Sequence, residues 1–200
     1  DFMRAVENGD DVTLSYVRPE VGQEIKHTVN AKEIFNEIAY QNWDMGEPGV
    51  LFWDNIKNWN LLSNDDDFEY AGTNPCAEEP LPAGGSCLLG SINLSEFVCD
   101  PYTDHPEFDM ATYRTTIRRA VRALNDVLDE GLPLHPLRIQ RDTVRDWRQI
   151  GLGVFGIADM LVKMGLDYGS EKARKVCIIL ASTLASTAIE ESATMAREYG

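Results

Sequence analysis

The spacing of apolar and polar residues near the start of the chain predicts a strand pair followed by a helix. Residues 12–17 and 24–28 have the composition of short strands joined by a polar turn. Asn30 suits the N-cap of the next helix, with Glu33 three residues later, and Gly46 is expected to end that helix. The apolar stripe of this helix consists of Ile34, Phe35, Ile38 and Ala39.

The middle of the chain is predicted to contain a strand, a long loop, an extended segment and a second strand. The apolar run 50–53 predicts a buried strand, and the polar, Asp/Asn-rich stretch 54–73 predicts a long surface loop. Prolines crowd residues 73–82, which favours an extended backbone. Gly84 and Gly85 then allow a sharp turn into an apolar strand that runs towards the core.

Helical periodicity dominates the second half of the chain. Asp109 is a suitable cap for a helix that extends to about Asp129, and further helices are predicted over residues 151–164 and 171–199. The fold class is therefore α/β, with helices packed around a mainly buried sheet or barrel. Residues 1–200 are expected to form one domain.

Composition narrows the classes of function. A formal net charge of −15 disfavours binding to nucleic acid polymers, because such a surface repels phosphate backbones. The hydrophobic content of 44% suits a sizeable core, and no apolar run is judged long enough to span a membrane. With no signal-peptide region at its start, the chain is expected to be cytoplasmic, and both ends look cut from a longer protein.

Four cysteines are present, and a cytoplasmic setting favours free thiols over disulfides. Cys99 and Cys177 are interpreted as structural. A zinc site built from Cys76, Cys87, Cys99 and His105 is disfavoured because no paired C-x-x-C motif is present, so no metal site is predicted.

Residues 151–156 match the G-x-G-x-x-G pattern of dinucleotide-binding proteins. The charged stretch before them does not suit a buried strand, and no second strand follows to carry a ribose-binding acid. The glycines are therefore interpreted as positions in a helix that allow close packing.

The most informative residues are Asn74, Cys76 and Glu78, which are spaced two apart. In an extended chain their amide, thiol and carboxylate would project to one side, with Ala77 on the other. Cys87 follows eleven residues after Cys76, and the intervening glycines would return this second thiol close to the first.

This segment, Asn-Pro-Cys-Ala-Glu-Glu-Pro-Leu followed by Cys87 and Gly-Ser-Ile-Asn-Leu, resembles the finger loop and next strand of ribonucleotide reductase catalytic (large) subunits. Residues 47–52, 150–159 and 168–171 resemble other segments of the same family, so the resemblance covers nearly the whole chain. It implies a fold that is part of a ten-stranded α/β barrel with a central finger loop at about residues 73–82.

The resemblance also implies residue roles. Cys76 would carry a thiyl radical that removes the ribose 3′ hydrogen, Glu78 would be the general base on the 3′ hydroxyl, and Asn74 would hydrogen-bond the sugar. Cys87 would be one of two thiols that reduce the 2′ position and end as a disulfide. Its partner thiol, and the phosphate-binding loop, would lie outside residues 1–200, so no turnover is expected from this segment alone.

The sequence of the motif most resembles that of the adenosylcobalamin-dependent class of the family. A diiron or dimanganese partner subunit is the alternative radical source. The implied partners are a ribonucleoside di- or triphosphate, a thioredoxin-like reductant and further copies of the catalytic chain. The residues that would bind the cofactor are not identified. A non-catalytic interaction or metal-binding module derived from such an enzyme is the alternative function.

Overall fold

The computed structural model describes residues 1–86 and 88–199 and divides into two compact units, residues 1–55 and 56–200. Each unit combines helices with two-stranded sheets, which confirms the mixed helix and strand content predicted from the sequence. One domain over residues 1–200 stays a prediction.

The first unit is a hairpin between helices. Its elements are α1 (Phe2–Asn8), β1 (Asp11–Arg18), β2 (Gln23–Asn30) and α2 (Ala31–Met45). The predicted strand pair is confirmed, with Tyr16 opposite Ile25 in an antiparallel register. The predicted cap is also confirmed, because the Asn30 side chain accepts the backbone N–H groups of Lys32 and Glu33. Gly46, in a left-handed conformation, ends α2 as expected.

The region that joins the two units differs from the prediction. Residues 50–52 form no strand, and Val50 and Phe52 are exposed. The predicted long loop contains a short helix, α3 (Trp53–Asn58), and ends in strand β3 (Gly72–Thr73). A short apolar run becomes a strand only when a second strand supplies its backbone partners, and the described residues supply none here.

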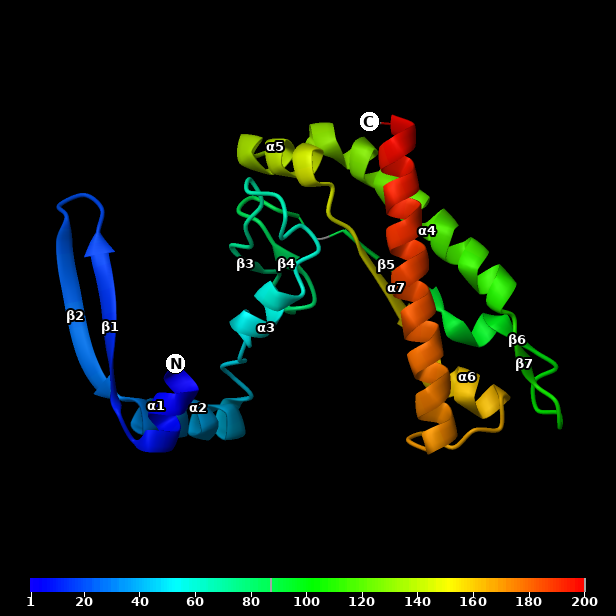
Figure 1. Ribbon diagram of the computed structural model, residues 1–200, viewed down its shortest axis with the longest axis horizontal. Helices are drawn as coiled ribbons and strands as arrows, with labels where there is room; N and C mark the ends of the chain where they lie inside the picture. Colours follow the sequence, from blue (N-terminus) through cyan, green and yellow to red (C-terminus); the bar gives the residue numbers. More distant parts are fainter. Residues whose placement is uncertain (87, 200) are drawn as a thin grey trace. The chain divides into compact units, whose positions relative to one another are not determined.

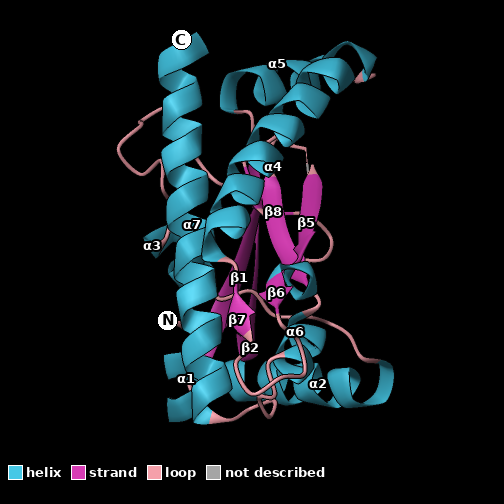
Figure 2. Ribbon diagram, turned by 90° about the vertical axis from the view of Figure 1, so that its right-hand side faces the viewer, coloured by secondary structure: helices cyan, strands magenta, loops and turns pink. Residues whose placement is uncertain are grey.

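The second unit holds the remaining elements, which Figures 1 and 2 show. They are β3 (Gly72–Thr73), β4 (Pro80–Leu81), β5 (Leu89–Asn93), η1 (Leu94–Phe97), β6 (Val98–Cys99), β7 (Glu107–Phe108), α4 (Met110–Gly131), η2 (Leu132–Leu134), α5 (Arg138–Trp147), β8 (Gly151–Phe155), α6 (Ile157–Lys163) and α7 (Glu171–Tyr199).

A parallel strand pair lies at the centre of this unit. β5 and β8 run side by side, with Ile92 opposite Val154, and the connection between them includes α4, which also contacts β5 (Figure 2). The predicted helix over residues 151–164 is therefore wrong in its first part, because residues 151–155 are a strand. Only α6 is helical there.

The prediction of α4 is confirmed. Asp109 caps it by accepting the N–H of Thr112 at 2.9 Å, and hydrogen bonds from Thr112 lower the pKa of Asp109. Val127 of this helix is 54% exposed. The residues that α4 buries recur at three- and four-residue steps and are Tyr113, Ile117, Val121, Leu124 and Leu128.

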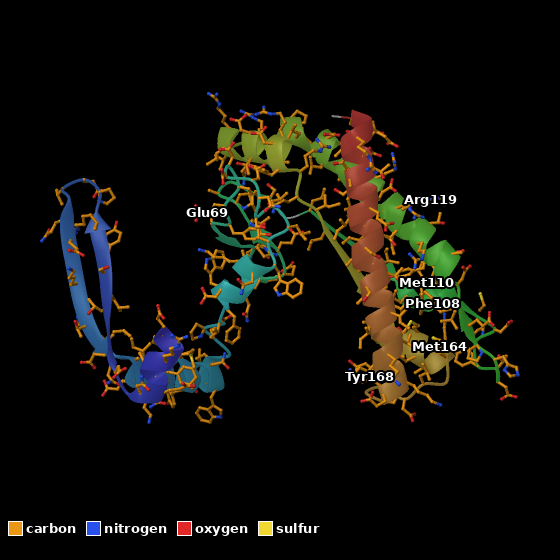
Figure 3. All side chains as sticks on the ribbon, viewed as in Figure 1. Glu69, Phe108, Met110, Arg119, Met164 and Tyr168 are labelled. Carbon is orange, nitrogen blue, oxygen red and sulfur yellow. The ribbon has the colours of Figure 1, made fainter. Side chains whose placement is uncertain are left out.

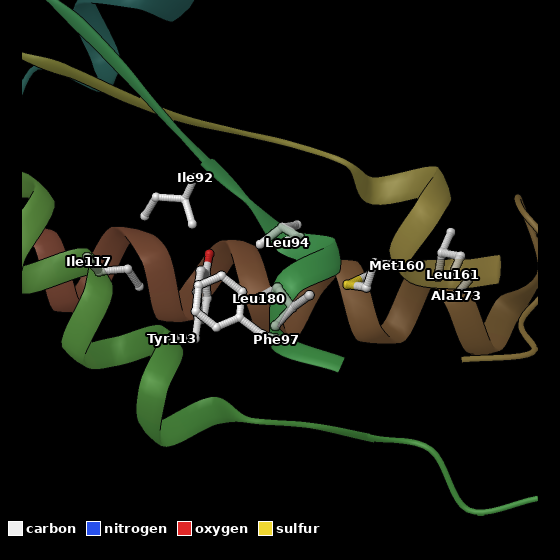
Figure 4. Close-up of a cluster of buried hydrophobic side chains, with 9 residues drawn as sticks. All are labelled: Ile92, Leu94, Phe97, Tyr113, Ile117, Met160, Leu161, Ala173 and Leu180. Carbon is white, nitrogen blue, oxygen red and sulfur yellow. The ribbon is translucent and has the colours of Figure 1, made fainter. Parts of the chain in front are cut away.

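The core of the unit lies between β5, η1, α4, α6 and α7, as Figure 4 shows. Its buried members are Ile92, Leu94, Phe97, Tyr113, Ile117, Met160, Leu161, Ala173 and Leu180. Phe108, Met110 and Met164 pack against it while partly buried, whereas Tyr168 is exposed beyond α6 (Figure 3). The strand pair is thereby covered by helices, as expected for an α/β fold.

α7 is attached to α4 by charge as well as by apolar packing. Glu191 is buried, and its carboxylate accepts from Arg122 and lies 3.7 Å from Arg118. Arg122 also donates to Glu198 at 2.9 Å, and these hydrogen bonds raise its pKa and lower that of Glu198. The buried face of α7 therefore includes polar residues that the apolar pattern alone did not identify.

Among the described helices, α7 alone is long and apolar enough to cross a membrane, contrary to the sequence expectation that no segment qualifies. A single helix of this kind is weak evidence, because core helices of soluble proteins pass the same test. α7 is held against α4 by the ion pairs of Arg122, and 22% of its apolar window is buried.

No closed barrel is formed by residues 1–86 and 88–199. Their strands pair only two by two, in four separate sheets. The coarse fold class from the sequence is confirmed, and the ten-stranded barrel stays a prediction about a longer chain.

Candidate active site

The three spaced residues lie on a small hairpin of the second unit. Its arms are β3 and β4, which pair antiparallel with Thr73 opposite Pro80. The backbone N–H of Ala71 donates to the carbonyl of Leu81 at 2.9 Å and extends the pairing by one step. Residues 74–79 form the connecting loop, so the segment for which a finger loop is predicted is a hairpin.

The loop is a tight turn rather than an extended chain, and the predicted alternation of side chains is wrong. Ala77 donates its N–H to the carbonyl of Asn74 at 3.0 Å, and its φ of 68° is left-handed. Pro75 occupies the second position of this turn, where the fixed φ of proline is favourable. The prolines therefore support a turn here, which is the alternative to the extended backbone expected from their number.

Asn74 and Glu79 close the loop. The N–H of Asn74 donates to the carbonyl of Glu79 at 3.1 Å, and the N–H of Glu79 donates to the Asn74 side-chain oxygen at 2.9 Å. Both residues are buried, at 8% exposure each. Asn74 thus has a structural role within the loop that the sequence interpretation missed.

Cys76, Ala77 and Glu78, by contrast, are all exposed. A free thiol and a carboxylate are thus exposed two residues apart on the loop, whereas Asn74 is buried. Cys87, the fourth predicted site residue, lies outside the described residues.

The hairpin is anchored to α5 and to the strand that follows it. Thr143 of α5 donates its hydroxyl to the carbonyl of Ala83 at 3.0 Å. The side-chain amide of Gln149 donates to the carbonyl of Pro80 at 3.3 Å. Because Gln149 lies two residues before the start of β8, the loop is attached close to the central strand pair.

Arg148 holds the turn between α5 and β8 against α4. Its guanidinium donates to both carboxylate oxygens of Asp129 at 2.8 Å and to the side-chain oxygen of Asn125 at 2.9 Å. These hydrogen bonds lower the pKa of Asp129 and raise that of Arg148. Arg148 has a left-handed φ of 46°, which a side chain rarely adopts without such support.

An apolar cavity of about 300 Å³ lies beside Ser86 and Leu88, which follow the hairpin in the sequence. Its lining includes Ser86, Leu88, Leu128, His135, Val144 and Gln149. Gln149, which lines this cavity, is also the residue that donates to the carbonyl of Pro80 in the hairpin.

The other cysteines lie apart from this loop in the sequence. Cys99 is exposed on β6, and Cys177 is half-buried on α7. Within the described part of the chain, no group of three or more His, Cys, Asp or Glu side chains is arranged to hold a metal ion.

Comparison with known proteins gives the wider context of this loop. The family model for the ribonucleotide reductase barrel domain matches residues 2–200. The chain belongs to this family. Membership confirms the resemblance that the motif around Cys76 indicated.

Several curated relatives of the ribonucleotide reductase family align over the full chain. The vitamin B12-dependent ribonucleoside-diphosphate reductase of Thermoplasma acidophilum is 36% identical, and that of Mycobacterium tuberculosis strain H37Rv is 34% identical. A vitamin B12-dependent ribonucleotide reductase of Streptomyces clavuligerus is 27% identical. The aligned region is 25%, 26% and 20% of these proteins, so the chain spans about a quarter or less of their length.

The glycine motif at residues 151–156 forms a strand and the turn that follows it. The Gly151–Phe155 strand lies within the motif rather than before it, and Gly156 begins the turn into α6 with a left-handed φ of 71°. A Cβ at Gly156 would overlap the side-chain oxygen of Asn93, so this glycine permits close packing, as predicted. The prediction that these glycines lie in a helix is wrong, because residues 151–155 form strand β8.

Proposed function

We propose that this chain is part of the catalytic subunit of a ribonucleotide reductase that converts ribonucleotides into 2′-deoxyribonucleotides by thiyl-radical chemistry. The observation that carries the proposal is the closed loop with exposed Cys76 and Glu78 in a chain matched by the family over residues 2–200. In the whole protein, this segment contributes to a ten-stranded α/β barrel in the cytoplasm.

The proposed chemistry uses the loop residues in sequence. The Cys76 thiyl sulfur takes the hydrogen atom from C3′, and Glu78 accepts the proton of the 3′ hydroxyl. The 2′ hydroxyl then leaves as water. Cys87 and a second thiol, from outside this chain segment, supply two electrons and two protons and end as a disulfide. Glu78 then returns its proton to the 3′ oxygen, and Cys76 returns the hydrogen atom to C3′, which regenerates the thiyl radical. Asn74 hydrogen-bonds the sugar hydroxyls while it closes the loop.

Adenosylcobalamin is the proposed cofactor, since the relatives are named vitamin B12-dependent. When bound, it supplies the radical that removes the hydrogen atom of the Cys76 thiol. The chain fits this role because the Cys76 side chain is exposed and free, so an external radical can reach it. No described residue is assigned to bind the cofactor.

The substrate is proposed to be a ribonucleoside diphosphate, because two of the relatives carry that substrate in their names. Reduced thioredoxin-like protein restores the thiols after each turnover, and the catalytic subunit forms homo-oligomers.

The test is ribonucleotide reduction by the full-length parent protein, with and without adenosylcobalamin. We expect cobalamin-dependent activity that Cys76→Ser abolishes. Cys99→Ser is the matched control, since Cys99 is also an exposed free cysteine but lies on β6. Activity that requires a metal-bearing partner subunit would refute the cofactor assignment.

Two results would refute the proposed site or function. Full activity in Cys76→Ser would exclude the proposed radical carrier. Tight zinc binding by the wild-type parent, without any ribonucleotide reduction, would instead support the non-catalytic metal-binding module.

A further inference from the structure

Glu78 and Glu79 are neighbours in sequence with opposite surroundings. The Glu78 side chain is exposed on the turn, whereas Glu79 is buried at the base of the loop. Glutamate is rarely buried unless its carboxylate is paired, because removing it from water is costly. The position of Glu79 therefore calls for a reason other than solubility.

The Glu79 side chain occupies the space beside Gly151, at the start of β8. A Cβ at Gly151 would overlap the carboxylate oxygen Oε1 of Glu79 and also a methyl group of Leu89. Gly151 has no positive φ, so its backbone conformation does not require glycine. The space taken by Glu79 and Leu89 is what excludes a side chain at this position.

The backbone of Gly151 is held in place independently. Its N–H donates to the carbonyl of Leu88 at 2.8 Å, and the residue pairs with Leu89 in the parallel β5–β8 register. Gly151 therefore provides a fixed surface for the Glu79 carboxylate, because moving it would disturb the central strand pair.

The same residue, Glu79, also closes the loop through its backbone. Its N–H and carbonyl both bond to Asn74, and the carbonyl of the next residue, Pro80, accepts from Gln149. A displacement of the Glu79 side chain is thus transmitted to Cys76 and Glu78, which are three and one residues away in the same short loop.

We propose that Glu79 is a positioning residue, whose carboxylate packs on Gly151 to fix the position and orientation of the loop that carries Cys76 and Glu78. The inference rests on the proposed reductase function and deepens it. Misplacing reacting groups by about 1 Å can cost about 100-fold in rate, so the packing is expected to act on kcat.

The experiment compares Gly151→Ala with Gly153→Ala in the full-length parent protein. Both substitutions add one methyl group to β8, but a Cβ at Gly153 would meet nothing nearer than 3.5 Å. We expect Gly151→Ala to lower kcat by about 10- to 100-fold with KM changed by less than about threefold, and Gly153→Ala to leave both unchanged. Equal effects of the two substitutions would overturn the proposal.

Variants of Glu79 avoid any overlap and keep the test decisive if Gly151→Ala does not fold. Glu79→Ala should lower kcat as Gly151→Ala does. The double variant should be no slower than Glu79→Ala, since the overlap with the carboxylate is gone and the remaining overlap is with a methyl group of the exposed Leu89 side chain, which can move aside. Glu79→Gln keeps the shape and should retain kcat within about threefold. A loss in Glu79→Gln as large as in Glu79→Ala would overturn a packing role.

A second readout separates this inference from the proposed function. Hydrogen exchange of the peptide 74–81, measured without substrate or cobalamin, should accelerate in Gly151→Ala and Glu79→Ala but not in Gly153→Ala. Unchanged exchange and unchanged kcat in these variants would refute the role of Glu79 while Cys76→Ser still tests the function. An inactive wild-type parent would refute the function, and exchange would still decide whether Glu79 holds the loop.

Discussion

The hydrogen bond from the Glu79 N–H to the Asn74 side-chain oxygen allows a quantitative prediction for Asn74→Ala. The bond is 2.9 Å long and buried, so alanine leaves a buried donor without its acceptor. Such a loss costs about 1–3 kcal/mol. The loop-opening equilibrium should therefore rise by about 5- to 150-fold, at about 1.4 kcal/mol for each factor of ten.

Asn74→Asp separates the loop-closing role of Asn74 from its proposed contact with the sugar. Aspartate keeps an oxygen for the Glu79 N–H but loses the amide N–H groups. If the amide also hydrogen-bonds the substrate, Asn74→Asp should protect the Glu79 amide from exchange and still have low activity. If Asn74 only closes the loop, Asn74→Asp should be nearly as active as wild type.

The assay is residue-resolved hydrogen exchange at the Glu79 amide, combined with ribonucleotide reduction by the full-length parent. Asn60→Ala is the matched control, because the Asn60 side chain accepts the Leu62 N–H at the same distance of 2.9 Å in an exposed loop. Water can replace that acceptor, so little change is expected. An unchanged exchange rate at Glu79 in Asn74→Ala would refute the reasoning.

Three further predictions concern the second unit. Ile117→Ala should destabilise the protein by about 2–5 kcal/mol in denaturant unfolding, because Ile117 is fully buried, whereas Val127→Ala on the same helix should cost about 0.5 kcal/mol or less. Tyr113→Phe should be neutral or stabilising in the same assay, since the buried Tyr113 hydroxyl has no hydrogen-bond partner among the described residues and burial raises its pKa; a marked loss would contradict this. Asp129→Asn should lower the melting temperature at neutral pH, and the difference from wild type should shrink as pH falls below about 4. The sign follows from the lowered pKa of Asp129 in the folded protein, which makes its stabilisation present above the unfolded pKa and lost as pH falls through the folded one. A difference that stays constant with pH would argue against the Arg148 contact as its source.

Local signals in the sequence were sufficient for several elements. The caps Asn30 and Asp109, the β1–β2 pair and the long helices α4 and α7 were predicted because short-range spacing and hydrogen bonds to adjacent N–H groups determine them. The residues of the candidate site were likewise proposed from the sequence, since the family resemblance depends on residue identity and order.

Other features depended on contacts between distant parts of the chain. Residues 151–155 are too short a run for periodicity to separate strand from helix, and pairing with β5, about sixty residues earlier, makes them a strand. Glu78 and Glu79 have identical side chains but different surroundings, because the fold buries Glu79 beside Gly151 and leaves Glu78 exposed. Sequence thus determines the local elements and the chemical groups, while tertiary packing determines which of those groups face outward, because burial depends on the neighbours that the fold supplies.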